Sequence, residues 1–182
     1  SPVLNVEEWM PSEIKTGVLN VNDRGGKSIG IISTQTNRAL QVSTPALMTY
    51  GPRDYVDPVT GESDGKITMA LQFSSPEYSK PVEKKFFGQL NEFIEKVTVM
   101  VVANSEIFFG KQQSREVVEN NFFPNIKYPK DKVTQKTDYT RAPTMNLKVP
   151  FYDGKWGLEI FDLKSTRVFP SEDANLTPMD FI

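Results

Sequence analysis

The sequence predicts a mainly β fold of the α+β class, with helices inserted between two groups of strands. Short runs rich in β-branched residues fill the first third of the 182-residue chain and return after residue 143. Apolar residues at helical spacing lie between the two groups. Gly, Pro, Asn and Asp separate the runs along the chain, as expected for turns.

The first group of strands is expected at residues 18–21, 28–33 and 39–43. Residues 34–38 read as the turn between the second and third strands. Pro45 interrupts the next run, so residues 47–50 are expected as an edge strand or a bulged continuation. Residues 52–65 are rich in turn formers and are expected to form a long loop. Apolar and polar residues alternate over 66–73, which predicts a strand with one buried face.

The helical region is expected to begin near Ser79, a candidate N-cap, with Pro81 in the first turn. Apolar residues recur at helical spacing over residues 86–101, which predicts an amphipathic helix packed on a sheet. A second helix is expected at about residues 112–120. Its inward-facing residues are expected to be Val117 and Val118.

The last third of the chain returns to β-structure after a long polar loop. Residues 121–143 contain several prolines, and loops of this length are usually functional or mobile. Strands are expected at residues 144–151 and 155–163, joined by a hairpin turn that contains the favourable pair Asp153-Gly154. A short strand at residues 167–169 is expected to close the sheet.

This order of elements matches an OB-fold, a small antiparallel barrel, with the helices inserted between the third and fourth strands. A β-sandwich with an inserted helical hairpin would give the same order, so the order alone leaves both folds open. We expect one domain over residues 1–169 and an acidic C-terminal tail at residues 170–182.

Two absent residue types restrict the chemistry of the chain. Without Cys there is no disulfide, thiol nucleophile or cysteine metal site, and without His the commonest general base and metal ligand are missing. We therefore expect a binding protein that is not an enzyme and needs no cofactor; an enzyme that works with carboxylates is the least favoured alternative. The chain has no apolar run long enough for a membrane span and no signal-like segment, so an intracellular location is expected.

Two local patterns resemble ligand-binding loops but lack their spacing. The stretch RGGKSIG, residues 24–30, ends like a phosphate-binding P-loop, but Val21 stands where the first glycine should be and a strand pattern follows instead of a helix. It is expected to be a turn between strands. The acidic residues of the 52–65 loop do not have calcium-loop spacing, so no metal site is expected at Asp54, Asp57, Glu62 and Asp64.

Charge and aromatic residues point to a partner. The net charge is −2, but residues 111–155 hold nine basic and five acidic residues. Lysines and arginines alternate there with aromatic rings, and single-stranded nucleic acid uses both, because cations neutralise its phosphates and rings stack on its bases. The candidate binding residues are Lys127, Tyr128, Lys130, Lys132, Tyr139, Arg141, Tyr152 and Trp156, with Arg24, Lys27, Arg38 and Arg53 extending the cationic track.

Alternatives remain open for these residues. Phe151 and Trp156 could belong to the core of the last hairpin, and the lysines could be solvated loop charges. The tail at residues 170–182 holds three acids and no base, and it ends in apolar residues. Such a tail can occupy a basic groove in place of nucleic acid or dock on a partner; a frayed terminus is the alternative.

Several strings resemble the single-stranded DNA-binding proteins of nucleo-cytoplasmic large DNA viruses, which are related to the single-stranded DNA-binding protein of T-seven-type phages. The strings are GGKSIGI, LQVSTPALMTYG, MALQF, NIKYPKDK and DYTRAPTMNLKVPF. The resemblance runs over about residues 15–170, and its most specific parts are residues 42–45 and 128–131.

The resemblance implies an OB-fold that coats single-stranded DNA without sequence preference in viral replication, recombination or repair, at replication sites in the host cell. It implies that a tail ending like Asp180-Phe181 contacts polymerase and helicase-primase, and it leaves a homodimer formed through the tail as an option. This tail departs from the phage pattern, because it has only three acids where the phage pattern has a dense acidic run. The alternative function is a protein-interaction or virion structural module without nucleic-acid binding.

Overall fold

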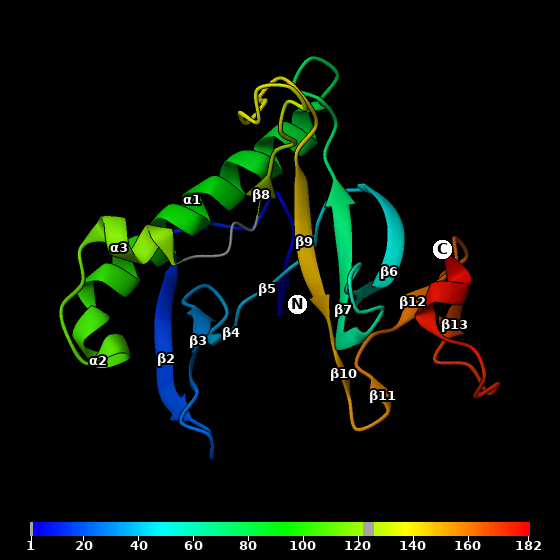
Figure 1. Cartoon of the computed structure of the whole chain (residues 1–182), viewed down its shortest axis with the longest axis horizontal. Helices are drawn as coiled ribbons and strands as arrows, with labels where there is room; N and C mark the ends of the chain where they lie inside the picture. Colours follow the sequence, from blue (N-terminus) through cyan, green and yellow to red (C-terminus); the bar gives the residue numbers. More distant parts are fainter. Residues whose placement is uncertain (1, 122–125) are drawn as a thin grey trace. The chain divides into compact units, whose positions relative to one another are not determined.

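The computed structural model describes residues 2–121 and 126–182 (Figure 1). The chain is mainly β with a few helices, and all strand pairs but one are antiparallel. The mainly β, α+β expectation is confirmed, whereas the described residues form no closed barrel. The fold divides into two compact units. The first unit consists of Ser1–Ala46 and Ser79–Phe123, and the second unit consists of Leu47–Tyr78 and Pro124–Ile182. The division into residues 1–169 and a tail stays a prediction.

The first unit begins with short strands, as expected. They are β1 (Val3–Leu4), β2 (Ile14–Val21), β3 (Lys27–Ser33), β4 (Arg38–Ala39) and β5 (Gln41–Val42). β2, β3 and β4 form an antiparallel sheet, and β1 pairs with β5 in parallel. Between β2 and β3 the Asn22 side chain accepts hydrogen bonds from the N–H groups of Arg24 (3.0 Å) and Gly26 (2.7 Å). RGGKSIG is therefore a turn that leads into a strand, and no helix N-terminus stands behind it.

Three helices complete the first unit: α1 (Pro81–Ala103), α2 (Ser105–Phe109) and α3 (Arg115–Asn120). Pro81 occupies the first turn of α1 as predicted, but the N-cap is Lys80 rather than Ser79. In α3, Val118 is buried (1% exposed) while Val117 is 41% exposed. The prediction that both point inward is wrong for Val117, because neighbouring residues of a helix are about 100° apart and only one of them can face the core squarely.

The second unit contains an antiparallel sheet in the order β6-β7-β9-β8. Its strands are β6 (Met48–Val56), β7 (Ser63–Gln72), β8 (Ile126–Lys127) and β9 (Thr144–Val149). β6 lies at the edge, as the proline pattern predicted. The predicted loop at 52–65 is wrong, because both strands continue through it and only residues 57–62 connect them. Pro52 is tolerated inside β6 since an edge strand need not donate every N–H group.

The chain ends in two small hairpins and a helical turn. β10 (Phe151–Tyr152) pairs with β11 (Lys155–Trp156) through Asp153 (φ 53°) and Gly154 (φ 72°), the positive angles that a tight hairpin turn requires. This confirms the predicted turn. β12 (Ile160–Phe161) pairs with β13 (Arg167–Phe169), so the last strand forms its own small sheet rather than closing the larger one. The 3-10 helix η1 (Pro178–Phe181) follows.

The long polar loop predicted at 121–143 is partly ordered. Residues 122–125 of that prediction lie outside the described residues. Beyond them, β8 pairs with the beginning of β9, and Lys130 pairs with Thr137 in an isolated antiparallel bridge. The loop therefore projects from the sheet as a narrow ordered hairpin. We call residues 130–136 the finger.

Candidate nucleic-acid interface

The four-stranded sheet of the second unit has one apolar and one polar face. Ile67, Leu71, Met145 and Val149 are buried on the first face. Residues directly opposite in an antiparallel pair share a face, and successive residues alternate between faces. The register thus places three rows of side chains on the second face: Lys127, Thr144, Gln72 and the exposed Met48; Asn146 and Ala70; Lys148, Thr68 and Arg53. We call these residues the polar sheet face.

The polar sheet face carries positive charge in its two outer rows. Lys127 lies in one row, and Lys148 and Arg53 lie in the other. Thr144 and Lys148 are four residues apart on β9, which corresponds to roughly 13 Å along the strand. The middle row is uncharged, and no acidic residue occurs in the three rows. An extended anionic chain can therefore meet cations at both ends and hydrogen-bonding groups between them.

A hollow of about 400 Å³ adjoins the Lys127 row. It is lined by Gln72, Lys127, Tyr128, Pro129, Arg141, Ala142 and Thr144. The rings of Tyr128 and Tyr139 meet edge to face with centroids 5.0 Å apart, and Tyr139 is largely exposed. Burial, and to a smaller extent Tyr139, raises the pKa of the Tyr128 phenol above its ordinary value. The hollow brings aromatic surface and cationic groups together in one place.

The positive charge of Arg141 is partly compensated by two neighbouring carboxylates, those of Asp131 and Asp138. Hydrogen bonds from Thr140 lower the pKa of Asp138, and the charge of Arg141 lowers it further. Backbone N–H groups of Thr134 and Val133 are the main cause of the lowered pKa of Asp131, to which Arg141 also contributes. Arg141 therefore shares its charge with two carboxylates. Lys127, which forms no ion pair within the described residues, is the less compensated cation of the hollow.

The last hairpin separates two of the predicted binding rings. Tyr152 lies opposite Lys155, and Phe151 lies opposite Trp156, so the two pairs occupy different faces of the hairpin. The Lys148 ammonium group sits 5.2 Å from the centre of the Tyr152 ring, which joins Tyr152 to the polar sheet face. Trp156 instead stacks on Phe151 with centroids 4.3 Å apart. The structure brings Tyr152, but not Trp156, to the candidate site.

The predicted cations of the first third of the chain are divided between the units. Arg53 belongs to the second unit and lies on the polar sheet face, whereas Arg24, Lys27 and Arg38 belong to the first unit. The Lys27 ammonium group donates a 3.4 Å hydrogen bond to the Phe108 carbonyl near the end of α2. That bond gives Lys27 a structural partner inside the first unit.

The finger holds the remaining predicted lysines, Lys130 and Lys132, in an ordered turn. The Asp131 N–H donates to the Lys136 carbonyl (2.8 Å), and the Asp131 carboxylate accepts from the N–H groups of Val133 and Thr134. Lys130 and Lys132 are exposed, with no ion pair in the described part of the chain. Their charges are available to an external partner.

Sequence reasoning missed several members of the polar sheet face. Lys148, Thr68 and Asn146 lie on the two central strands, β7 and β9, and the sequence patterns did not mark them as binding residues. The alternation that marked Ile67, Leu71 and the other core residues also fixes which residues face away from the core. Reading the polar half of the same alternation would have found them.

The C-terminal segment is packed against the second unit. Asp180 accepts hydrogen bonds from the N–H (2.7 Å) and hydroxyl (3.2 Å) groups of Thr177, and the Phe181 ring lies 5.9 Å from that of Phe169. Ile182 lies so close to Gly51 of β6 that a Cβ at Gly51 would approach it to 2.7 Å. A frayed terminus is therefore not what the structure shows, and both predicted tail residues have intramolecular roles.

Replacing Phe181 by Ala is expected to lower the free energy of unfolding by about 1–3 kcal/mol, because the ring loses its contact with Phe169. Urea unfolding followed by circular dichroism measures the change. Glu172→Gln, which removes an exposed tail charge without removing packing, is the control and should leave stability nearly unchanged. Equal stability of Phe181→Ala and the parent would contradict the packed arrangement.

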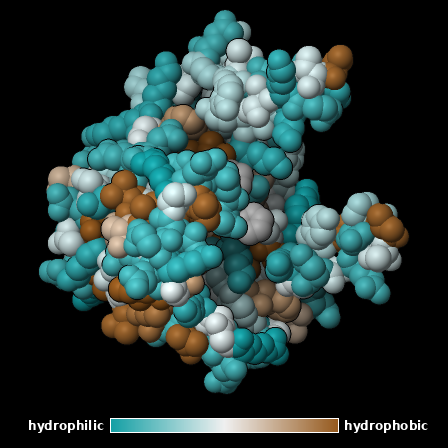
Figure 2. Space-filling model, turned by 60° about the vertical axis from the view of Figure 1, so that its left-hand side comes forward, coloured by the Kyte–Doolittle hydropathy of each residue, from teal (hydrophilic) through white to brown (hydrophobic). Residues whose placement is uncertain are grey.

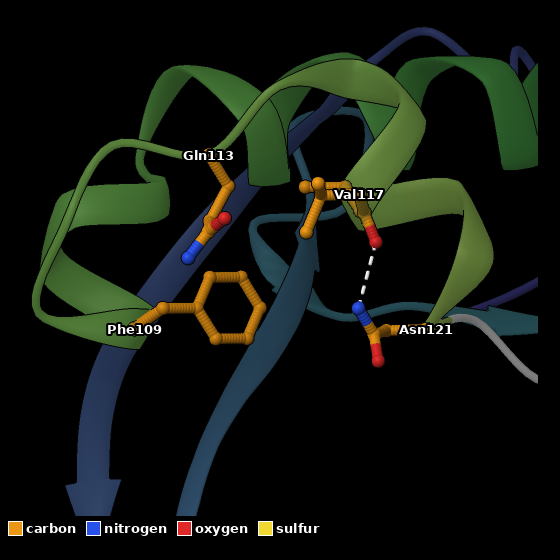
Figure 3. A pocket seen from close by; sticks show the side chains of 5 residues that line it. Phe109, Gln113, Val117 and Asn121 are labelled. Atoms are coloured by element: carbon orange, nitrogen blue, oxygen red, sulfur yellow. Dashed lines mark hydrogen bonds between the residues drawn. The ribbon is translucent and has the colours of Figure 1, made fainter.

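The first unit carries an apolar pocket of about 210 Å³. Figure 3 shows Phe109 of α2 pointing towards Gln113 and Val117, with Asn121 bonded to the Val117 carbonyl (2.7 Å). Apolar side chains also reach the surface among hydrophilic ones in the view that turns this side forward (Figure 2). Exposed apolar residues of α2 include Ile107 and Phe109. This pocket has no cation in its lining and differs in chemistry from the polar sheet face.

In the described ranges, 2–121 and 126–182, no cluster of three or more His, Cys, Asp and Glu side chains is arranged to hold a metal ion. No helix in the same ranges has the length and apolar character needed to cross a membrane.

Comparisons of the chain with protein-family models, with curated proteins and with solved structures found no match.

Proposed function

We propose that this protein binds single-stranded DNA without sequence preference and protects it. The observation that supports the proposal is the polar sheet face, on which Lys127, Lys148 and Arg53 stand without an acid in their rows. Tyr152 lies over Lys148 at one end, and the hollow with Tyr128 adjoins the other end. Cations placed along an open surface neutralise successive phosphates, and rings at its ends stack on bases.

The same arrangement favours single strands over duplex. Rings gain stacking energy, about 1–3 kcal/mol per base, only from bases that are already unpaired. The three rows of the polar sheet face lie across neighbouring strands of one open sheet, a surface on which unpaired bases can lie flat. The polar groups beside the cations, Asn146 in the middle row and Thr68 in the row of Lys148, can bond to sugar, phosphate or base without selecting one sequence.

The finer proposals rest on the sequence resemblance. We propose a replication, recombination or repair role at viral replication sites in the host cell, without enzymatic activity, with polymerase or helicase-primase as further partners. The OB-fold belongs among these proposals: OB-folds are partly open barrels, and helices stand between β7 and β8 in the chain order.

Fluorescence anisotropy with labelled oligo-dT and a duplex of equal length tests the proposed binding. The single strand is expected to bind more tightly than the duplex, and its affinity should fall as salt rises, with a slope of about 0.7 per phosphate neutralised. If the single strand and the duplex bound equally tightly, the proposed stacking of the rings on unpaired bases would be contradicted. Absence of binding even at low salt, with and without residues 170–182, would reject the function.

The second candidate is a protein-interaction or virion structural role without nucleic-acid binding. One observation favours it: the apolar pocket lined by Phe109 of α2 and by Val117 and Val118 of α3 (Figure 3). On this alternative neither nucleic acid would bind in the anisotropy experiment, and Phe109→Ala would weaken association with a partner protein. The two functions thus give opposite results with oligo-dT.

A further inference from the structure

Two turns of the second unit have the same sequence pattern and the same hydrogen bonds. Residues 57–61 read DPVTG and residues 131–135 read DKVTQ, so Asp, Val and Thr recur at the same places. We call the first, with its flanking residues 54–64, the acidic tip. The second lies in the finger. The two turns have equivalent backbone hydrogen bonds and equivalent hydrogen bonds to the Asp side chain.

In each turn the first Asp closes the loop. Its N–H donates to the carbonyl five residues later, Glu62 (2.9 Å) in one turn and Lys136 (2.8 Å) in the other. The carbonyl of the same Asp accepts from Gly61 (2.8 Å) or Gln135 (2.9 Å), and these two residues have φ angles of 72° and 58°. The two turns are therefore equivalent rigid hairpin ends.

The Asp side chains and the valines also correspond. The Asp57 carboxylate accepts from the N–H groups of Val59 (2.7 Å) and Thr60 (3.1 Å), and the Asp131 carboxylate accepts equivalently from Val133 and Thr134 (both 2.8 Å). These bonds lower the pKa of both carboxyl groups. Val59 and Val133 are each 91% exposed, so each turn presents an apolar side chain at its end.

The two turns differ in charge. The acidic tip contains four acids, Asp54, Asp57, Glu62 and Asp64, and no base. Arg53 directly precedes the segment. The finger contains Lys130, Lys132 and Lys136 against the single Asp131. Glu62 and the three lysines take part in no ion pair within the described residues. Two turns with the same backbone hydrogen bonds thus carry opposite net charge.

The turns also lie beyond opposite ends of the same sheet. The acidic tip leads into the start of β7, whose Ile67 lies opposite Val149 at the end of β9. The finger precedes Thr144 at the start of β9, which lies opposite Gln72 at the end of β7. Figure 1 shows the finger segment, in yellow, beyond the upper end of β9, with β10 beyond its lower end. A contact between a tip and a finger therefore has to come from two different molecules.

We propose that copies of this chain associate head to tail, with the acidic tip of one copy docked on the finger of the next. Charge complementarity selects the pairing, and Val59 and Val133 supply apolar surface at its centre. An interface built from two different patches does not close on itself as a two-fold dimer does, so it can repeat from copy to copy. The proposal does not depend on nucleic-acid binding.

The contact is expected to be weak in free solution. Two hairpin ends bury far less than the roughly 1,200 Å² of a stable interface, and exposed ion pairs contribute little each. Copies bound side by side on one strand, however, meet at a high effective concentration, so a weak contact becomes sufficient. Salt should weaken the association because the charges are exposed to solvent.

The test exchanges charges between the two surfaces and measures self-association of the full chain without DNA by sedimentation velocity at low salt. The first variant is Glu62→Lys with Asp64→Lys, which leaves two acids and two bases in the acidic tip and so removes its net charge. The second is Lys132→Glu with Lys136→Glu, which makes both ends acidic. Each variant alone is expected to associate on the order of tenfold more weakly than the parent, because the first loses the attraction between the two surfaces and the second makes like charges face each other.

Mixing the two variants is the decisive step. The unchanged acidic tip of the second variant can then meet the unchanged basic finger of the first, so the mixture is expected to form one-to-one pairs with the affinity of the parent contact. The variant Glu62→Lys alone, which leaves the hydrogen bonds of its turn in place, covers the case in which a double variant misfolds. Glu172→Lys and Lys164→Glu change the same charges elsewhere in the second unit and should associate like the parent.

Three outcomes would overturn the proposal: no association of the parent at low salt, parental association of the two charge-exchange variants, or no recovery in their mixture. These outcomes are distinct from failure of DNA binding, which is measured separately with short oligo-dT that holds one copy. If the finger lysines serve only as phosphate contacts, Lys132→Glu with Lys136→Glu should weaken binding to DNA and leave sedimentation unchanged, which would also overturn the proposal.

Discussion

Replacing Lys127 and Lys148 together by glutamate is expected to weaken binding to oligo-dT roughly 100-fold at low salt, on the order of tenfold for each reversal. Each substitution removes an attraction to phosphate and adds a repulsion, in two different rows of the polar sheet face. The salt dependence should also become shallower by about 1.4, since two phosphates are no longer neutralised. Fluorescence anisotropy over a salt series measures both changes.

A matched control separates the site from net charge. Lys111→Glu with Lys164→Glu changes the total charge by the same amount, and both residues are exposed and lie outside the three rows of the polar sheet face. This control is expected to weaken binding only a few-fold, through the general field of the protein. If the control loses as much affinity as the Lys127 and Lys148 variant, the polar sheet face has no special role. Unchanged thermal midpoints for both variants would show that folding is intact.

Replacing Phe86 by Ala is expected to lower the free energy of unfolding by about 3–5 kcal/mol. Phe86 is 1% exposed, and its ring lies 6.2 Å from that of the buried Trp9, so its removal leaves a cavity in the first unit. Urea unfolding followed by circular dichroism gives the free energy. Tryptophan fluorescence, measured with Trp156→Phe in both proteins so that Trp9 is the remaining tryptophan, reports on the surroundings of Trp9.

Phe109→Ala is the control for this substitution. It deletes the same ring, but Phe109 is 50% exposed on α2, so the loss is expected to stay below about 1.5 kcal/mol. If the two variants lost similar stability, the core of the first unit would not be centred on Phe86. If Phe86→Ala left fluorescence unchanged, the contact between Trp9 and Phe86 would be absent.

The fold was predictable where a local pattern decides the structure. The alternation over residues 66–73 gave β7 and its buried face, and Asp153-Gly154 gave the last hairpin, because both depend on neighbouring residues alone. The turn formers of residues 52–65 were misleading. Most of that segment is strand because pairing with β7 outweighs its weak intrinsic preference, which is a tertiary effect.

The sequence indicated which types of residue the candidate site contains, cations and aromatic rings, better than it indicated where each of them lies. The alternation of cations and rings identified Lys127, Tyr128 and Tyr152, yet it also selected Trp156, which the hairpin directs to its other face. Lys27 bonds to a carbonyl of the first unit, a long-range contact that no local pattern encodes. The rows of the polar sheet face depend on the register between β7 and β9, which the sequence does not specify locally.

The interleaving of the two units has a consequence for synthesis of the chain. β7 pairs with β9, but the stretch Ser79–Phe123, which belongs to the first unit, is made between them. At about 5–20 residues per second, roughly 4–15 s separate the release of Gln72 from that of Val149. During this interval the nascent β6–β7 hairpin exposes an unpaired strand edge beside the apolar residues Ile67 and Leu71. The ribosome-bound chain therefore passes through a state prone to aggregation, in which a chaperone would bind β7 first.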